Sequence, residues 1–388
     1  MIALTAARLF TPQDEIRDPL LLLEDGSILE VTSRQARETP KSCRAIDFPG
    51  AILAPGYLDI HIHGSAGYDI MDASPEALPS VERLLAMHGV SRYVPTTVTA
   101  PLDKTLAALE RLAKAIEQAK NPASSNNGLR ARPLGIHLEG PFISHAKSGV
   151  HPLQDILPPT RQTFERLWEA ARGHVVIMTI APEIDGALEL IEEATRRGVC
   201  VSLGHSDSDV KIAHTAIARG ARHATHTFNA MRSLDHRDPG IIGAVLTDDR
   251  VSADIIADGI HLDPSVVQLF LKAKGNEKAV LISDAVSATG MPEGRYRLGS
   301  FEVDVVDGKC TAGGKLAGSL LQLDEAVRNV VQFANWDLRQ AVRLATVNPA
   351  KVIGVQRKAV LAQGANADIV VLSPDGNVKK TIVAGQGI

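Results

Sequence analysis

The chain has 388 residues, of which 45 % are apolar and 22 % are charged, as is typical of a folded globular protein. The formal net charge of −4 excludes an overall basic field that would attract nucleic acid or an anionic membrane, so neither partner is expected and an anionic substrate must be met by local groups. The three cysteines, Cys43, Cys200 and Cys310, are far apart and odd in number, which excludes a disulfide framework and predicts a reducing, cytoplasmic location.

The two ends of the chain share a β-rich pattern. Residues 3–10 predict a strand, and residues 19–33 and 367–386 each predict a hairpin with an Asp-Gly turn. We therefore expect one small β-sandwich domain built from both ends, residues 1–54 and 349–388; two unrelated hairpins are the alternative. The first ten residues lack the pattern of a signal peptide, and no apolar run approaches the roughly 20 residues that span a bilayer.

Eight apolar, β-rich runs follow one another through the middle of the chain. They begin at Tyr57, Ser91, Arg132, Val175, Cys200, His223, Val251 and Ala279. Helix-like segments separate most of them, and several open on a residue that favours the helix N-cap, namely Ser74, Asp103, Asp185 and Asp263. This alternation predicts an α/β fold, a (β/α)8 TIM-like barrel over residues 55–348.

Two connections depart from this alternation. Residues 232–250, between the sixth and seventh runs, indicate a loop-rich and only weakly helical connection. Residues 121–132 are polar and indicate a surface connection rather than a domain boundary.

Polar residues gather where the predicted strands end. They are His61 and His63 in the first run, Glu139 in the third, His205 in the fifth, His226 in the sixth and Asp284 in the eighth. Barrel enzymes carry their active sites at this carboxyl-end face, so we expect these side chains to converge there. A set of packed histidines and a buried salt bridge is the alternative, but no lysine or arginine lies at these strand ends to pair with the two carboxylates.

The spacing of the histidines points to a divalent metal. His61 and His63 are two apart on a strand, so both side chains point to the same face and can reach one ion, with Asp59 behind them. Glu139 has two oxygens and could bridge two ions, while Asp284 could bind one ion and also accept a proton. Imidazole and carboxylate ligands suit zinc, and also iron, manganese or cobalt.

Other polar residues are less specific. His137 and His223 are expected to have packing or supporting roles. His151 and His261 follow predicted strands and would lie at the same rim. The Gly-rich segment at residues 312–319 lacks the order of residues in a nucleotide-binding P-loop.

Seven motifs in this order resemble one known family. They are "PGYLDIHIHG", "HLEGPF", "LGHS", "THTFNAM", "DGIHLDP", "ISDA" and "LAGS". The chain resembles the N-acetylglucosamine-6-phosphate deacetylases, a family within the amidohydrolase superfamily, over nearly its whole length. The glutamate of "HLEGPF" is specific, because most amidohydrolases use a carboxylated lysine as the bridging ligand.

The resemblance implies a role for each matching residue. Glu139, His205 and His226 would hold the principal metal, and His61 and His63 would hold a second ion with Glu139 and Asp284. Some members lack this histidine pair and work with one ion; both histidines are present here, so two ions are favoured over one. Asp284 would be the general acid/base, and His151 would help to polarise the acetyl carbonyl.

The resemblance also implies contacts to a phosphorylated amino sugar. The matching residues are Val150, Asn229, Ala230, Arg237, Asp258, His261 and Leu316 to Gly318, which includes Ala317. Arg237 would reach the active site of the neighbouring subunit, which implies a homodimer. The implied reaction is metal-dependent hydrolysis of the N-acetyl group from N-acetylglucosamine 6-phosphate, giving glucosamine 6-phosphate and acetate.

Three alternatives remain. A cyclic-amide hydrolase would need a bridging lysine, which the third and fourth runs lack. A phosphosugar aldolase or isomerase on the same barrel would not need this many histidines with ligand spacing. A non-catalytic metal-binding relative would not need Asp284.

Overall fold

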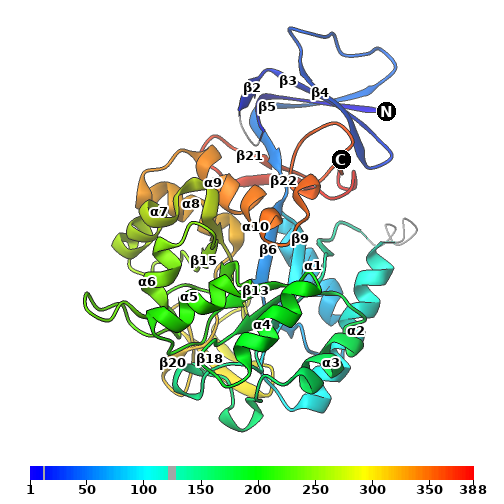
Figure 1. Cartoon of the computed structure of the whole chain (residues 1–388). Helices are drawn as coiled ribbons and strands as arrows, with labels where there is room; N and C mark the ends of the chain where they lie inside the picture. The colour runs from blue at the N-terminus through cyan, green and yellow to red at the C-terminus, as the bar shows by residue number, and fades with distance from the viewer. Residues whose placement is uncertain (12–13, 121–127) are drawn as a thin grey trace.

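The computed structural model describes residues 1–11, 14–120 and 128–388. Figure 1 shows a barrel ringed by helices, with a sheet at one end that contains strands from both termini. Most of the polar connection predicted over residues 121–132 lies outside the described residues. Within the described parts of the chain, no helix combines the length and apolar character that a membrane span requires.

Eight parallel strands form the barrel, and each coincides with one of the predicted runs, although β9 begins one residue before its run. They are β6 (Tyr57–Ile62), β9 (Val90–Thr97), β11 (Ile136–Glu139), β12 (Val175–Ile180), β13 (Cys200–Leu203), β14 (His223–Ala224), β15 (Ala253–Ile255) and β16 (Ala279–Leu281). β6 to β14 pair in chain order, with the short β10 (Arg132–Pro133) beside β9, and β15 pairs with β16. The predicted TIM-like barrel is confirmed.

Backbone hydrogen bonds join these two sheets at both seams. Thr227 N donates to Asp254 O at 2.9 Å between β14 and β15, and Asp284 N donates to His61 O at 2.9 Å between β16 and β6. The strands are buried almost without interruption, as their continuous apolar runs require when helices cover a parallel sheet.

Most helices of the barrel are amphipathic and bury one apolar face. They are α1 (Ala77–Met87), α2 (Leu102–Ala119), α3 (Arg161–Ala170), α4 (Ala187–Arg196), α5 (Val210–Ala218), α6 (Gly240–Thr247), α7 (Pro264–Lys278) and α8 (Leu323–Ala334). α9 (Leu338–Leu344) and α10 (Val347–Val352) follow, and short 3-10 turns lie at η2 (His145–Lys147), η3 (Leu153–Asp155) and η4 (Gln356–Lys358).

One of the four predicted helix N-caps is confirmed and three are wrong. Asp263 caps α7, because its side chain accepts a hydrogen bond from Ser265 N. The N-caps of α1, α2 and α4 are instead Glu76, Pro101 and Gly186, within two residues of the predicted Ser74, Asp103 and Asp185. The connection between the sixth and seventh strands contains a full helix, α6, because its apolar residues pack into the core.

Both termini contribute to one seven-stranded sheet. Its strands run in the order β22 (Val378–Ile382), β21 (Ile369–Leu372), β5 (Arg44–Pro55), β1 (Ile2–Phe10), β3 (Pro19–Glu24) and β4 (Ser27–Ser33), with β2 (Glu15–Arg17) beside β1. The two predicted hairpins are β3–β4 and β21–β22. The sheet has an apolar core of its own that includes Leu4, Leu53 and Ile369. Its description as a sandwich stays a prediction.

A four-stranded antiparallel sheet lies between β16 and α8. It consists of β17 (Gly294–Leu298), β18 (Phe301–Val306), β19 (Lys309–Ala312) and β20 (Lys315–Leu316). A two-stranded hairpin, β7 (Gly64–Ser65) and β8 (Tyr68–Asp69), follows β6. It contacts the four-stranded sheet, since Gly299 N donates to Asp69 Oδ2 at 2.7 Å. The sequence did not predict this inserted sheet, which forms one wall of the pocket described next.

Candidate metal and active site

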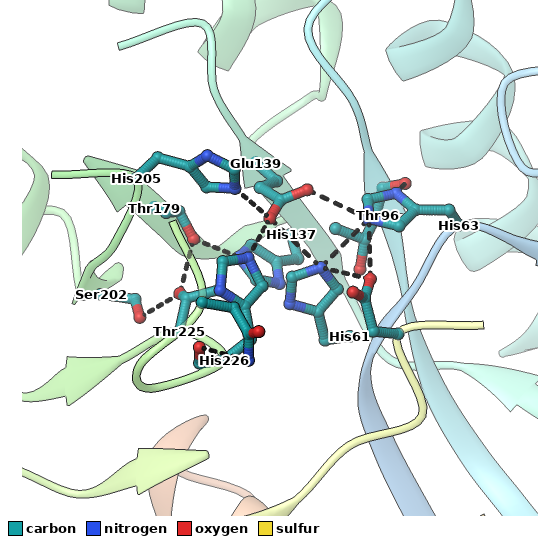
Figure 2. A network of polar contacts seen from close by, with 12 residues as sticks. His61, His63, Thr96, His137, Glu139, Thr179, Ser202, His205, Thr225 and His226 are labelled. Carbon is teal, nitrogen blue, oxygen red and sulfur yellow. Dashed lines mark hydrogen bonds and ion pairs between the residues drawn. The ribbon is translucent and has the colours of Figure 1, made fainter. Parts of the chain in front are cut away.

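Glu139, the last residue of β11, lies at the centre of a cluster of histidines (Figure 2). Its Oε1 lies 2.9 Å from Nε2 of His226 and 3.2 Å from Nε2 of His205. Its Oε2 lies 3.0 Å from Nε2 of His63 and 3.6 Å from Nε2 of His151. The residue is only 3 % exposed, and its ion-pair partners among the described residues are all histidines. The two oxygens thus face different groups of ligand atoms.

A second group of possible ligands lies beside Glu139, where His61 Nε2 is 3.5 Å from Oε1 and His63 Nε2 is 3.0 Å from Oε2. His61, His63 and Asp284 each offer a ligand atom, and these atoms all lie within 4.8 Å of one another. The Nε2 atoms of the two histidines face each other at 3.1 Å, and Asp284 Oδ1 lies 3.4 Å from the first and 3.2 Å from the second. Two imidazole nitrogens that face each other at this distance need a proton or a cation between them.

The structure also brings Glu139, His151 and His205 together, with ligand atoms within the same 4.8 Å. Geometry alone therefore makes His151 as close to a metal position as His205. The hydrogen bond at Nδ1 distinguishes His151 from His205, because it determines which ring nitrogen carries the proton.

When neutral, His63 and His205 both present an unprotonated Nε2 to the centre. His63 Nδ1 lies 3.2 Å from Thr96 O, and His205 Nδ1 lies 2.9 Å from Lys147 O. A carbonyl oxygen only accepts, so Nδ1 must be the N–H and the neutral ring has its lone pair on Nε2. Both residues are therefore set up to bind a metal.

His151 has the opposite arrangement. Thr99 N donates to its Nδ1 at 3.3 Å, and Thr99 Oγ1 lies 2.8 Å from the same atom. The neutral ring therefore carries its proton on Nε2, which can donate a hydrogen bond but cannot ligate. Burial, reinforced by His205, lowers the pKa of His151 to about 4, so the ring is neutral near pH 7. Gly140 permits the contact, since a Cβ there would overlap Thr99 Oγ1.

The charges of the cluster suit a divalent cation. Burial raises the pKa of Glu139 and Asp284, but nearby histidines, His61 foremost, lower each pKa below its ordinary value. Burial lowers the pKa of His63 and His226, but the nearby carboxylates have the larger effect. They raise the pKa of His63 well above its ordinary value and that of His226 to about 9. Ionised carboxylates thus draw protons onto neighbouring histidines. A metal can replace those protons, because its ligands bind deprotonated, and the donor set fits one.

Three of these residues have a backbone conformation that side chains disfavour. His205, His226 and Asp284 have φ values of 47°, 31° and 50°, just past the ends of β13, β14 and β16. Non-glycine residues with positive φ cluster at functional sites, where the surrounding structure enforces them. Asp254 supports one of them, accepting hydrogen bonds from His226 N and binding His223 Nε2 at 2.8 Å.

Other polar residues support the cluster from below. His137 donates from Nδ1 to Ile60 O at 3.1 Å and its Nε2 accepts from Thr179 Oγ1 at 2.8 Å. Asp59 accepts hydrogen bonds from His61 N and from the Ser283 hydroxyl, so it ties β6 to the residue before Asp284. Their contacts agree with the packing and supporting roles expected for His137, His223 and Asp59.

A pocket of about 230 Å³ opens above these residues. The predicted substrate contacts that line it are Val150, Asn229, Ala230, His261, Leu316 and Gly318. The described lining does not include Asp258, Ala317 or Arg237. Asp258 lies behind His261, with Oδ2 2.7 Å from Nδ1, and Ala317 is buried among apolar residues of the inserted sheet.

Arg237 lies on an exposed loop and does not reach the pocket of its own chain. Its Nε donates to His236 Nε2 at 3.0 Å, and its N donates to Asp235 Oδ1 at 2.9 Å. This position leaves the side chain free to approach another molecule.

Sequence reasoning missed several residues around the pocket. Leu298 and Lys315 come from the inserted sheet; Leu298 lines the pocket, and Lys315 Nζ lies 3.4 Å from Gly149 O, next to the loop that carries His151. Glu183 accepts hydrogen bonds at 2.7 Å from Ser206 Oγ and from the next backbone N–H, and so holds the loop after His205. The "APE" that follows the fourth strand was the available signal for Glu183.

Comparisons with known proteins agree with this geometry. The model of the amidohydrolase family matches residues 52–388. The chain is 37 % identical to an N-acetylglucosamine-6-phosphate deacetylase from Vibrio furnissii over 94 % of this chain and 88 % of that protein. It is 35 % identical to an N-acetylgalactosamine-6-phosphate deacetylase from Escherichia coli O157:H7 over 99 % of this chain and 98 % of that protein.

A solved structure has the same fold over the whole chain. It is a variant of N-acetyl-D-glucosamine-6-phosphate deacetylase from Mycobacterium smegmatis, in complex with N-acetyl-D-glucosamine-6-phosphate. The TM-score is 0.92 at 33 % sequence identity, and the match covers 100 % of this chain and 98 % of that one.

Proposed function

The chain belongs to the amidohydrolase family, and we propose that it is a metal-dependent hydrolase that removes the N-acetyl group from N-acetylglucosamine 6-phosphate. The products would be glucosamine 6-phosphate and acetate. The observation that carries the proposal is Glu139, whose two oxygens face separate groups of histidines where a cyclic-amide hydrolase would need a lysine. The names of the most similar relatives support the same reaction.

The metal would be held by the residues whose Nε2 and carboxylate oxygens converge. Glu139, His205 and His226 would hold the principal ion. His61, His63 and Asp284, with the second oxygen of Glu139, would hold another. Zinc suits this nitrogen and oxygen donor set. When bound, a divalent ion lowers the pKa of a water ligand and polarises an amide carbonyl.

Asp284 would move the protons of the reaction. Its carboxylate is ionised, faces the pocket and is 6 % exposed, so it can take a proton from an attacking water. The same group would then deliver that proton to the leaving nitrogen, which is needed because an amine leaves poorly as an anion. The left-handed backbone at Asp284 and the bond from its N–H to His61 O hold the side chain at the rim.

His151 would stabilise the oxyanion rather than bind metal. Its Nε2–H points to the centre because Thr99 occupies Nδ1, so it can donate to the acetyl oxygen as negative charge develops there. A neutral histidine with this fixed tautomer is suited to that task.

The sugar phosphate would be bound by groups at the pocket mouth. His261, oriented by Asp258, would contact the phosphate with the turn at Asn229 and Ala230. Val150 and the segment from Leu316 to Gly318 would contact the sugar.

Arg237 would complete this site from a neighbouring subunit, which makes the working form a homodimer. Its exposure in its own chain supports this proposal. Mixing Arg237→Ala subunits with Asp284→Asn subunits tests it. We expect mixed dimers to recover one intact site, so that activity rises above that of either variant alone; no rise would contradict the shared site.

We also infer that residues 55–348 form the catalytic barrel, and that residues 1–54 with 349–388 form a separate β-sandwich unit. A cytoplasmic location, inferred from the three free cysteines, belongs to the same proposal.

Acetate release tests the reaction directly. The metal-free protein, with and without added zinc, would be assayed with N-acetylglucosamine 6-phosphate, its unphosphorylated analogue and N-acetylgalactosamine 6-phosphate. We expect metal-dependent release that is fastest with the first substrate. Faster release from the galactosamine epimer would move the assignment to the other relative's substrate, and no release from any substrate would refute it.

A further inference from the structure

A cavity larger than the catalytic pocket lies outside the barrel. Its volume is about 780 Å³, against about 230 Å³ for the catalytic pocket. It lies between α1 and α2, with β10 at its base and Val383 and Gln386 of the C-terminal segment at its edge. None of the described residues that line it belongs to the metal cluster, so the proposed reaction leaves this cavity unexplained.

The wall of the cavity carries more positive than negative charge, although the whole chain is acidic. Its cationic side chains are Arg111, Lys114, Arg130 and Arg132, and its acidic ones are Asp72 and Glu82. Both acidic groups are already engaged. Asp72 Oδ1 accepts a hydrogen bond from Ser74 N at 2.8 Å, and Glu82 accepts one from Tyr93 at 3.1 Å while its other oxygen lies 3.6 Å from Arg130.

Arg132 is the unusual member of this group. It is half-buried, yet it makes no side-chain hydrogen bond or ion pair with any residue in the described ranges. Its neighbour across the strand pair, Arg92, is fully engaged, since its Nε donates to Asp368 Oδ2 at 2.7 Å. Burial lowers the pKa of Arg132 and Arg92 adds to that effect, while the charges of Asp368 and Glu82 oppose it without a hydrogen bond. The five N–H donors of the Arg132 guanidinium thus lie beside another arginine and have no acceptor among the described residues.

A planar guanidinium in this state matches a phosphate, which it can bind through two parallel hydrogen bonds. Most of the remaining wall is apolar and includes Ile70, Leu78 and Leu112, with Ser74, Gln118 and Gln386 as its uncharged polar side chains. A phosphate alone would leave most of the volume empty. We propose that this cavity is a second ligand site, for a small molecule that carries a phosphate and an apolar body, with Arg132 as its main anion contact.

The cavity is connected to the catalytic pocket by direct contacts. Arg111 Nη2 donates to Met71 O at 2.7 Å, and Asp69 accepts hydrogen bonds from Met71 N and from Gly299 N. Gly299 follows Leu298, which lines the catalytic pocket. A ligand in the cavity would therefore contact the segment that leads from the metal strand to the pocket wall.

Calorimetric titration of the metal-loaded protein with phenyl phosphate tests the proposal. We expect two binding events per chain, one at each site, and we expect Arg132→Met to weaken one of them at least tenfold. Arg132→Lys, which keeps the charge, should retain part of the affinity. Arg166→Met, at an exposed arginine of α3, should bind like the parent and serves as the control.

A cavity-filling variant covers the case in which Arg132→Met does not fold. Ala115→Phe, on the α2 wall, should remove the same event without changing any charge. Inorganic phosphate should bind at least tenfold more weakly than phenyl phosphate at this site, because it leaves the apolar wall unused. Equal binding by Arg132→Met and the parent would overturn the proposal. So would a parent that shows a single event which His261→Ala abolishes, a result that would leave the proposed catalytic function intact.

Discussion

The two ends of the barrel both bury charged groups, but they neutralise them differently. At the amino end, Arg92 and Asp368 form a closed pair, and the second oxygen of Asp368 accepts a hydrogen bond from Ala384 N at 2.7 Å. At the carboxyl end, the ion-pair partners of Glu139 and Asp284 within the described part of the chain are all imidazoles.

This difference separates a structural charge from a functional one. In the amino-end pair, Arg92 already neutralises the carboxylate, so the folded chain needs no further ion there. The carboxyl-end cluster has ligand atoms that are satisfied only when protons or a metal enter. The following predictions test this difference at the rim and at buried charges elsewhere.

Asp284→Asn should have the largest effect on turnover. Losing the group that moves protons should lower kcat by about 10³–10⁴-fold, while the metal remains bound. The matched control is Asp324→Asn, a buried carboxylate of α8 that pairs with His88 at 3.0 Å and Arg328 at 2.9 Å. The control should lose stability and keep its turnover. Steady-state kinetics with metal analysis would measure both, and equal turnover in the two variants would remove Asp284 from the mechanism.

Arg92→Met should have the largest effect on stability. Removing one partner leaves Asp368 buried without its cation, which costs about 3–5 kcal/mol in the free energy of unfolding. Urea unfolding would measure the loss, and kcat of the folded protein should be unchanged. The double variant Arg92→Met/Asp368→Asn should recover part of the loss. A change below about 1 kcal/mol would mean that water already reaches this pair.

His151→Asn should separate catalysis from metal binding. Loss of an oxyanion donor should lower kcat by about 10²–10³-fold with no change in metal per chain. His205→Asn, at the proposed ligand with the opposite tautomer, should lose metal as well as activity. Metal analysis after dialysis distinguishes the two, and loss of metal from His151→Asn would show that His151 is a ligand.

Glu82→Gln tests a buried carboxylate that has too little positive charge around it. Burial raises the pKa of Glu82 from 4.5 to about 7, and Arg130 only partly opposes this. Between these values the folded state holds a proton that the unfolded state releases, so this carboxyl makes the parent less stable as pH rises. The loss is about 2–3 kcal/mol between pH 5 and pH 8.

The variant should therefore gain stability relative to the parent over that range. Urea unfolding at both pH values would measure it. The control is Glu110→Gln on the exposed face of α2, whose stability difference from the parent should not change with pH. If the stability difference between Glu82→Gln and the parent also did not change with pH, the Glu82 carboxyl would already be ionised at pH 5.

Much of the barrel could be predicted from the sequence because its strands are continuous apolar runs. The same pattern placed His61, Glu139 and Asp284 at strand ends, where a parallel barrel brings them together. Helix starts were less accurate, since packing moved the N-caps of α1, α2 and α4 by up to two residues from the residues with the best capping side chains.

The features that distinguish His151 from His205 could not be predicted. Their roles depend on a backbone N–H of Thr99 and a carbonyl of Lys147, which are groups that every residue carries and no side-chain pattern marks. The inserted sheet was also missed, because its strands are largely exposed and pack on loops rather than on the barrel, so no continuous apolar run marks them.

The inserted sheet leaves and rejoins the barrel at one point. Val286 N donates to Ser319 O at 3.2 Å, and Ser319 N donates to Asp284 O at 2.8 Å, so both ends of the insertion are fixed beside the proposed catalytic carboxylate. The chain between these ends supplies Leu298 and Leu316 to the pocket wall but none of the proposed metal ligands. Its length and sequence are therefore free to vary independently of the reaction chemistry. Exchanging residues 287–318 between relatives should change which sugar is accepted and leave the metal centre in place.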